Sequence, residues 1–190
     1  MASKKFLIFL AALSVALILS NSFLVVQNLR LRSQLVSRTP RATPILKEGE
    51  KADSFTAKDM NGQVVSLDFD GSSSKRALLF FSTTCPFCHK QFPYWQQLLS
   101  NADQGQYRLT ALTTETDTQA IRKYLHSMNC DRLEVLTIAP EVAARYKLNV
   151  TPITLVIGNN GLVEKTWSGM WREDSLTSAS SYFAVNFTAQ

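Results

Sequence analysis

The sequence predicts an α/β domain with a mixed central sheet, helices on both faces of that sheet and a β-hairpin extension at its N-terminal side. Three observations support this fold class. Strand and helix patterns alternate over residues 76–146, as in parallel strands joined by crossover helices. An antiparallel strand pair and a closing helix follow within residues 150–183. The dipeptide Asn61-Gly62 lies between two short alternating segments, which is a strong hairpin signal.

An uncharged apolar stretch precedes this domain. Residues 6–26 carry no charged side chain, and their number is about that of a helix that crosses a bilayer. We therefore expect a cytoplasmic tail at residues 1–5, a transmembrane or uncleaved signal anchor at residues 6–26, a basic linker at residues 27–46 and the folded domain at residues 47–190. A cleaved signal peptide is the alternative, but the apolar run continues past the small residues at 20–22 where cleavage would occur.

The positive charge of the chain belongs to its N-terminal segments. The whole sequence has a net charge of +5, whereas residues 47–190 contain 14 Lys and Arg against 15 Asp and Glu, a net charge of −1. A domain with this balance is not expected to bind nucleic acid. The basic linker instead suits contact with anionic lipid headgroups.

The remaining elements of the domain follow from local patterns. Residues 76–82 form a short, continuous apolar run, which is typical of a central strand buried on both faces. Apolar side chains then recur at helical spacing. We expect helices at about 89–101, 117–127, 140–146 and 172–183, and further strands at 107–113, 133–138, 154–157 and 162–167, with the last two strands joined by a turn at 159–161.

Two cysteines stand between the first of these strands and the helix that follows. Cys85 and Cys88 are three residues apart, so at a helix start they lie on one turn and can form a disulfide. Unpaired backbone N–H groups and the helix dipole favour a thiolate at the first position. We therefore predict a pKa below about 8.5 for Cys85 as the nucleophile. Cys88, which is more shielded, is the predicted resolving cysteine.

Four features together resemble the thioredoxin fold. They are the cysteine pair between strand and helix, Pro93 inside that helix, Thr151-Pro152 before a strand, and the turn after that strand. The resemblance implies a cis peptide bond at Pro152 and a substrate chain that pairs with the backbone of Thr151 as an added strand. We expect the substrate to contact Thr151 and Pro152, and also Pro86 and Phe87 between the two cysteines.

The N-terminal anchor, the basic linker and the hairpin segment at residues 49–67 make the chain similar to membrane-anchored thioredoxin-like proteins of the TlpA and ResA type, with an N-terminal hairpin like that of AhpC/TSA proteins. The similarity covers about residues 47–183. It implies a thiol–disulfide oxidoreductase that exchanges disulfides with exported proteins, for example in cytochrome c maturation or a related periplasmic thiol pathway.

An enzyme of this type has further implied properties. It uses the redox-active disulfide Cys85–Cys88 and no other cofactor or metal. Its partners are the thiols and disulfides of exported proteins and an upstream membrane thiol reductant or oxidant. Its expected location is the inner membrane, which it crosses once, with the redox domain on the periplasmic side, where disulfides persist.

The sequence also departs from the family pattern. Thr84 replaces the usual aromatic residue before the first cysteine, Leu79 replaces a buried acid or amide, and Gln91 replaces a glutamate. The direction of electron flow therefore stays open. Glu115 and Asp117 are the nearest carboxylates that can accept a proton from the resolving cysteine.

A carrier function is the alternative. Cys85-Pro86-Phe87-Cys88-His89 matches the pattern for covalent haem c attachment, and the two cysteines with His89 are possible copper ligands. A haem- or copper-carrying module, however, leaves Pro93 and Thr151-Pro152 without a role. Cys130 is expected to be a buried, unpaired thiol.

Overall fold

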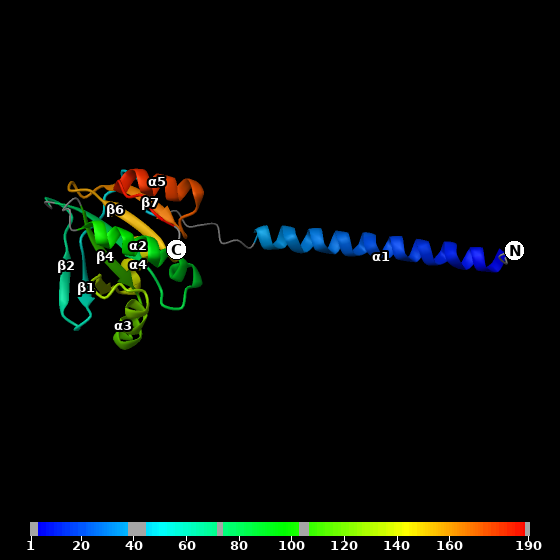
Figure 1. Cartoon of the computed structure of the whole chain (residues 1–190), viewed down its shortest axis with the longest axis horizontal. Coiled ribbons are helices and arrows are strands. Elements are labelled where there is room, and N and C mark those ends of the chain that lie inside the picture. Colours follow the sequence, from blue (N-terminus) through cyan, green and yellow to red (C-terminus); the bar gives the residue numbers. More distant parts are fainter. Residues whose placement is uncertain (1–3, 38–44, 72–73, 103–106, 189–190) are drawn as a thin grey trace. The chain divides into compact units, whose positions relative to one another are not determined.

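A computed structural model describes residues 4–37, 45–71, 74–102 and 107–188 of the 190-residue chain. The chain forms two compact units, Met1–Thr43 and Pro44–Gln190. Figure 1 shows the elements, which are α1 (Lys4–Ser37), β1 (Phe55–Asp59), β2 (Val64–Leu67), β3 (Lys75–Phe80), α2 (Pro86–Ala102), β4 (Tyr107–Thr113), α3 (Thr118–Ser127), β5 (Glu134–Thr137), α4 (Pro140–Arg145), β6 (Ile153–Ile157), β7 (Val163–Ser168) and α5 (Glu173–Phe183).

The first unit contains a single described helix, α1, which has 34 residues. It includes residues 27–37, the first half of the segment that the sequence predicts as a linker. This stretch is rich in leucine, arginine and glutamine, which are strong helix formers, and it contains no glycine or proline that would end the helix. Residues 38–44 of the predicted linker lie outside the described residues, as do residues 1–3 of the predicted tail. The last two linker positions belong to the second unit, where Leu46 is buried in the core and Ile45 packs against it.

Apolar side chains are exposed along α1. Ile8, Ile18 and Leu24, for example, are each more than half exposed, at 69%, 64% and 57%. Within the described residues, none of the helices combines the length and the apolar character that a membrane span requires.

The second unit is built on a seven-stranded sheet with the strand order β2-β1-β5-β4-β3-β6-β7. The three inner strands β3, β4 and β5 are parallel, whereas the pairs β3–β6, β6–β7, β1–β5 and β1–β2 are antiparallel. The β1–β2 hairpin adds two strands to one edge, as predicted, and Gly62 in its turn has a φ of +83°, which glycine adopts without steric cost. The mixed sheet and its hairpin extension confirm the predicted fold class.

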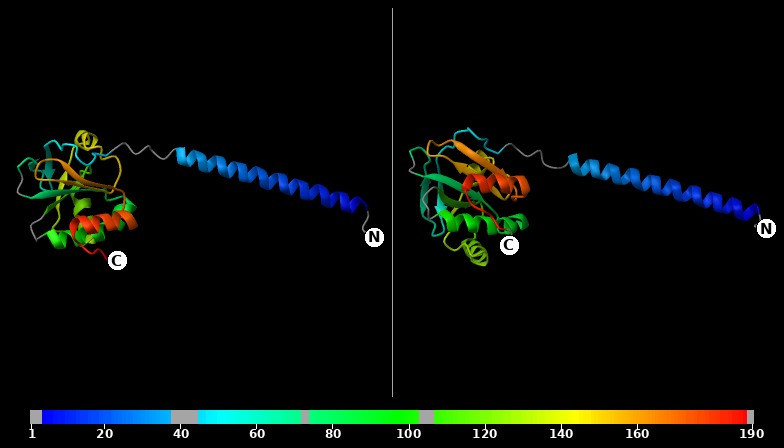
Figure 2. Two further views of the ribbon diagram at one scale, coloured as in Figure 1. Left: turned by 90° about the horizontal axis from the view of Figure 1, so that it is seen from above. Right: turned by 45° about the horizontal axis from the view of Figure 1, so that its top comes forward.

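Strand β3 contributes to two separate hydrophobic cores. Ala77 and Leu79 pack with buried residues of α2, α3 and α5. Leu78 and Phe80 point to the opposite face and pack with α4 and the hairpin. Alternate side chains of one strand point to opposite faces of a sheet, so the continuous apolar run at residues 76–82 is explained by helical cover on both sides. The left view of Figure 2 shows α4 on one side of the sheet and α2 and α5 on the other.

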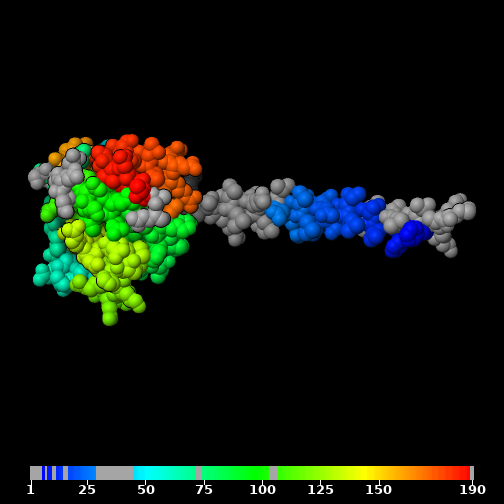
Figure 3. Space-filling model, viewed as in Figure 1, coloured from blue at the N-terminus to red at the C-terminus, as the bar shows by residue number. Residues whose placement is uncertain are grey.

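The hairpin and α3 lie side by side at one edge of the domain (Figure 3). A guanidinium nitrogen of Arg122 on α3 donates hydrogen bonds to the carbonyl oxygen of Met60 at 3.0 Å and to the side-chain oxygen of Asn61 at 3.2 Å. These contacts fix the turn of the hairpin against the body of the domain.

Candidate active site

The two cysteines of the site lie at the junction of β3 and α2. The helix begins at Pro86, three residues earlier than predicted, because proline suits the first helical position, where a backbone N–H has no helical partner. The backbone N–H of Cys85 donates to the carbonyl oxygen of Ser82 at 3.3 Å, and that of His89 donates to the carbonyl of Cys85 at 3.3 Å. Cys85 therefore immediately precedes the helix, and Cys88 lies in its first turn. Both are free thiols.

The environment of Cys85 favours its thiolate form. Burial alone would raise the pKa of this partly exposed thiol, but hydrogen bonds with the side chain of Thr151, with the backbone and thiol of Cys88 and with the backbone of Phe87 outweigh burial and lower the pKa below its ordinary value. The backbone N–H groups are the unpaired donors of the first helical turn. The direction of the predicted pKa shift is thus confirmed.

Cys88 has the opposite character. Its side chain is 0% exposed and packs in the core with α2 and α3. Burial, with the sulfur of Cys85 next to it, raises the pKa of Cys88 to about 12, against a smaller lowering by the backbone of Ser82. The site therefore holds one accessible thiol that readily ionises and one buried thiol that does not.

This asymmetry predicts selective alkylation. In the reduced protein we expect iodoacetamide to modify Cys85 first, at a rate that rises with pH and levels off below the ordinary thiol pKa, because only the thiolate reacts. Cys88 and Cys130 should remain unmodified at the same pH. Mass spectrometry of the digested protein would locate the label. In denaturant all three cysteines should react alike, and equal rates for Cys85 and Cys88 in the folded protein would contradict the description of the site.

The segment before β6 lies against Cys85. The thiol of Cys85 donates to the carbonyl oxygen of Thr151 at 3.4 Å, although 66 positions separate the two residues. The antiparallel pairing of β6 with β3, in which Ile153 is opposite Phe80, brings them together. The Thr151-Pro152 peptide bond is cis, as the resemblance implies.

The helix that carries the cysteines is tied to the same strand. The indole nitrogen of Trp95 donates to the hydroxyl of Thr154 at 3.0 Å in the core. Trp95 also packs edge-on against Phe92, with ring centroids 5.1 Å apart. Of the four apolar positions predicted to face the core, Phe92, Trp95 and Leu98 are buried and Leu99 is partly buried against the same core, so the core-facing side of the helix is confirmed.

Glu115 holds the turn that leads into the site. One carboxylate oxygen accepts from the hydroxyl of Ser82 at 2.7 Å and from the backbone N–H of Thr83 at 2.8 Å, and the other accepts from the hydroxyl of Thr83 at 2.8 Å. Asp117 accepts from the backbone N–H groups of Gln119 and Ala120 and caps α3. The sequence predicts both carboxylates as possible proton acceptors. In the structure one of them holds a backbone turn and the other caps a helix.

All three positions that depart from the family pattern are neutral; Leu79 and Gln91 are buried, whereas Thr84 is exposed. Leu79 is fully buried in the core of the α2 side. The side-chain oxygen of Gln91 accepts from the backbone N–H of Trp171 at 2.8 Å. Gln91 thus links α2 to the loop before α5 without adding a charge beneath the cysteines.

The remaining candidate residues divide between surface and core. Pro86, Phe87 and His89 are exposed, and Phe87 presents an apolar ring beside the cysteine pair. Cys130 is a buried free thiol, as expected, and burial raises its pKa to about 11. Among the described residues, no group of three or more His, Cys, Asp or Glu side chains is arranged to hold a metal ion.

Sequence reasoning missed one residue of the site. Tyr124 on α3 is buried, and its ring stacks on Phe81 and packs edge-on against Phe92. Burial, followed by the charges of Cys88 and Cys85, raises the pKa of its hydroxyl. The sequence holds no signal for this placement, because Tyr124 reads there only as one apolar position of an amphipathic helix.

The fold and the site define a thioredoxin-like thiol–disulfide oxidoreductase. More particularly, the chain belongs to the AhpC/TSA family, whose characteristic sequence matches residues 49–166. It is similar to the thiol–disulfide oxidoreductase ResA of Bacillus subtilis, with 25% identity over 131 residues that cover 69% of this chain and 73% of the relative.

Solved structures support the same fold. The crystal structure of a putative thiol:disulfide interchange protein DsbE from Chlorobium tepidum superimposes with a TM-score of 0.62 at 23% identity, and the match covers 73% of this chain and 97% of that protein's chain. A secreted disulfide oxidoreductase of Mycobacterium tuberculosis superimposes with a TM-score of 0.54 at 20% identity, and the match covers 67% of this chain and 95% of that protein's chain.

Proposed function

We propose that this protein exchanges disulfides with exported proteins, with Cys85 as the nucleophile and Cys88 as the resolving cysteine. The observation that carries the proposal is the contrast between the two thiols: Cys85 is partly exposed with a lowered pKa, whereas Cys88 is fully buried with a pKa raised to about 12. A thiolate attacks a disulfide and a thiol does not. The first attack on a partner therefore belongs to Cys85.

The exchange proceeds in two steps. The thiolate of Cys85 attacks a partner disulfide, which forms a mixed disulfide and releases one partner thiolate that takes up a proton. Cys88 then loses its proton and attacks the sulfur of Cys85, which forms the Cys85–Cys88 disulfide and releases the second partner thiolate. Two electrons pass from the protein to the partner. The same steps in reverse oxidise a partner dithiol.

The partner chain binds across the exposed end of the site. Its backbone pairs with Thr151 as an added strand, and its side chains contact Pro152, Pro86 and Phe87. In the reduced protein the carbonyl of Thr151 accepts a hydrogen bond from the Cys85 thiol. Once the sulfur of Cys85 is bonded to the partner, it has no proton to donate, and this carbonyl becomes available to a backbone N–H of the partner.

We infer the place of the reaction from the N-terminal segment. Residues 6–26 anchor the chain in the inner membrane as a single span, residues 1–5 stay in the cytoplasm, and the redox domain lies on the periplasmic side. Support comes from the uncharged sequence of this segment, from its helical form and exposed apolar side chains, and from the likeness to a secreted oxidoreductase. The partners are then the thiols and disulfides of exported proteins, including those of cytochrome c apoproteins. A membrane thiol reductant or oxidant is the upstream partner.

The reduction potential of the cysteine pair tests this proposal. The full chain is equilibrated in glutathione or dithiothreitol buffers of defined ratio, and the thiols of Cys85 and Cys88 are counted. We expect one reversible two-electron transition. A value of about −270 mV or lower identifies a reductant of exported proteins, and a value near about −120 mV identifies a disulfide donor.

Two variants control the measurement. Cys130→Ser should leave the transition unchanged, because this thiol is buried away from exchange. Cys85→Ser should remove the transition altogether. Failure of the unmodified chain to show a reversible couple would disprove the exchange function, and haem or copper titration of Cys85, Cys88 and His89 would then test the carrier alternative.

A further inference from the structure

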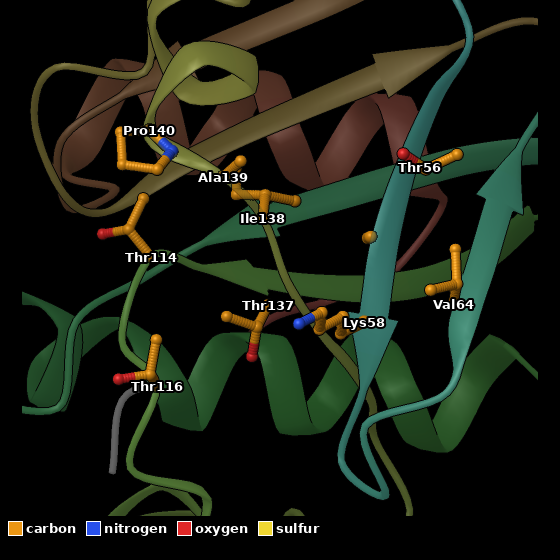
Figure 4. A pocket seen from close by; sticks show the side chains of 10 residues that line it. Thr56, Lys58, Val64, Thr114, Thr116, Thr137, Ile138, Ala139 and Pro140 are labelled. Carbon is orange, nitrogen blue, oxygen red and sulfur yellow. The ribbon is translucent and has the colours of Figure 1, made fainter.

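A pocket lies away from the cysteines, beside the β1–β2 hairpin. It has a volume of about 380 Å³ and lies between the hairpin, the segment that follows β4 and the end of β5. Figure 4 shows Lys58 and Val64 of the hairpin on one side, Thr114, Thr116 and Pro140 on the other, and Thr137, Ile138 and Ala139 between them. None of the roles described above uses this pocket.

The lining of the pocket combines one cation with apolar and hydroxyl groups. Among the described residues, Lys58 is the only charged side chain that lines it, and Lys58 takes part in none of the ion pairs found between described residues. Val64, opposite Lys58 in the hairpin register, is a valine that is 70% exposed. The threonine side chains add hydroxyl donors. This lining suits an acidic group with apolar neighbours.

The acidic residues near the pocket already have hydrogen-bond partners. Asp59, next to Lys58, accepts from the backbone N–H groups of Asn61 and Gln63 at 2.8 Å each. Glu115 is bonded to the turn before Cys85, and Asp117 caps α3. Among the described residues the ammonium group of Lys58 therefore has no acidic partner, so it can bind an acidic group from outside.

The pocket and Cys85 lie at the same end of the parallel strands. Cys85 follows β3, while Thr114 and Thr137 stand at the carboxyl ends of β4 and β5, which run parallel to β3. Neighbouring strands are about 4.8 Å apart, so two to three strand spacings place the pocket about 10–14 Å from the cysteine. An extended chain covers this distance in about three to four residues.

We propose that this pocket is a specificity subsite for the partner chain, and that it receives an acidic side chain with apolar neighbours about three to four residues from the partner's reactive cysteine. The inference rests on the proposed exchange function. Thr151-Pro152 precedes β6, on one side of β3, and the pocket lies on the other side across β4. A partner chain held at Thr151 therefore crosses Cys85 before it reaches the pocket.

Matched peptides test the subsite. Each contains one cysteine, oxidised as a mixed disulfide with 2-mercaptoethanol, and either Glu or Gln at the third or fourth position on either side. The rate of reduction by the reduced full chain is followed by chromatography after acid quenching. We expect a Glu peptide to react about 1.5- to 5-fold faster than its Gln counterpart, as for an exposed ion pair.

Variants of Lys58 show whether the pocket causes the preference. Lys58→Gln should remove it, and Lys58→Glu should reverse it in favour of a peptide with Lys at the same position. Lys123→Gln, which removes an exposed positive charge on α3 outside the pocket, should leave it unchanged. Equal rates for the Glu and Gln peptides at every position, or a preference that survives Lys58→Glu, would overturn the subsite and leave the exchange function intact.

A binding measurement distinguishes peptide binding at the pocket from disulfide exchange at the cysteines. Peptides with serine in place of cysteine cannot exchange disulfides, but they should still shift the amide NMR signals of Val64 and Thr137 more strongly with Glu than with Gln. Such shifts without any disulfide reduction would support the pocket and disprove the exchange function. Peptide disulfides that react without a Glu-dependent shift would disprove the pocket alone.

Discussion

Replacement of Cys85 by serine is expected to reduce disulfide exchange by about 10³-fold or more, because a serine hydroxyl does not ionise to a nucleophile comparable with the Cys85 thiolate. The lowered pKa that favours the thiolate belongs to this position alone among the three cysteines. Turnover of a peptide disulfide with excess dithiothreitol measures the loss. Full activity of Cys85→Ser would show that another group performs the first attack.

The companion variant Cys88→Ser should behave differently. Attack by Cys85 still forms the mixed disulfide, but the resolving thiol is missing, so the partner stays attached. Non-reducing electrophoresis should therefore show a protein–partner adduct that a reductant releases. Cys130→Ser is the matched control, since it removes another buried thiol, and it should show neither the adduct nor a loss of turnover. Absence of the adduct in Cys88→Ser would remove Cys88 from the mechanism.

Replacement of Trp95 by alanine is expected to lower the free energy of unfolding by about 3–5 kcal/mol. The side chain is 1% exposed, packs on Phe92 and donates a hydrogen bond to Thr154. For a domain of this size the melting temperature should fall by roughly 6–20 °C. Urea unfolding followed by circular dichroism measures the change.

Thr154→Val separates the hydrogen bond from the packing. It keeps the shape of the side chain and removes only the acceptor, so the indole N–H of Trp95 loses its partner, and we expect a cost of about 1–3 kcal/mol. A loss below about 1 kcal/mol for Trp95→Ala would mean that the contact between α2 and β6 contributes little to the stability of the domain.

Local signals were sufficient to predict most of the sheet. The continuous apolar run of β3 and the Asn61-Gly62 turn each determine the backbone through neighbouring residues, and the structure confirms both. The cysteine pair is similarly local, because the spacing of Cys85 and Cys88 and their position before a helix specify the direction of the Cys85 pKa shift.

Contacts between distant segments were not predictable in the same way. Glu115 was identified only as a carboxylate near the site, and its hydrogen bonds to Ser82 and Thr83 depend on the adjacency of β3 and β4. The pocket beside Lys58 depends on the docking of the hairpin onto β5. The extension of α1 through residues 27–37 was not predicted, because this stretch is polar and basic like a linker although its residues have high helix propensity.

The burial of Cys88 also determines how the reduction potential of the cysteine pair depends on pH. A dithiol that ionises at neither sulfur takes up two protons with its two electrons, and its potential falls by about 59 mV for each pH unit. Above the lowered pKa of Cys85 only the proton on Cys88 remains, and it is retained up to about pH 12. Over that whole range the potential therefore falls by about 30 mV per pH unit, so the driving force for exchange with a partner dithiol that stays protonated also shifts by about 30 mV per pH unit.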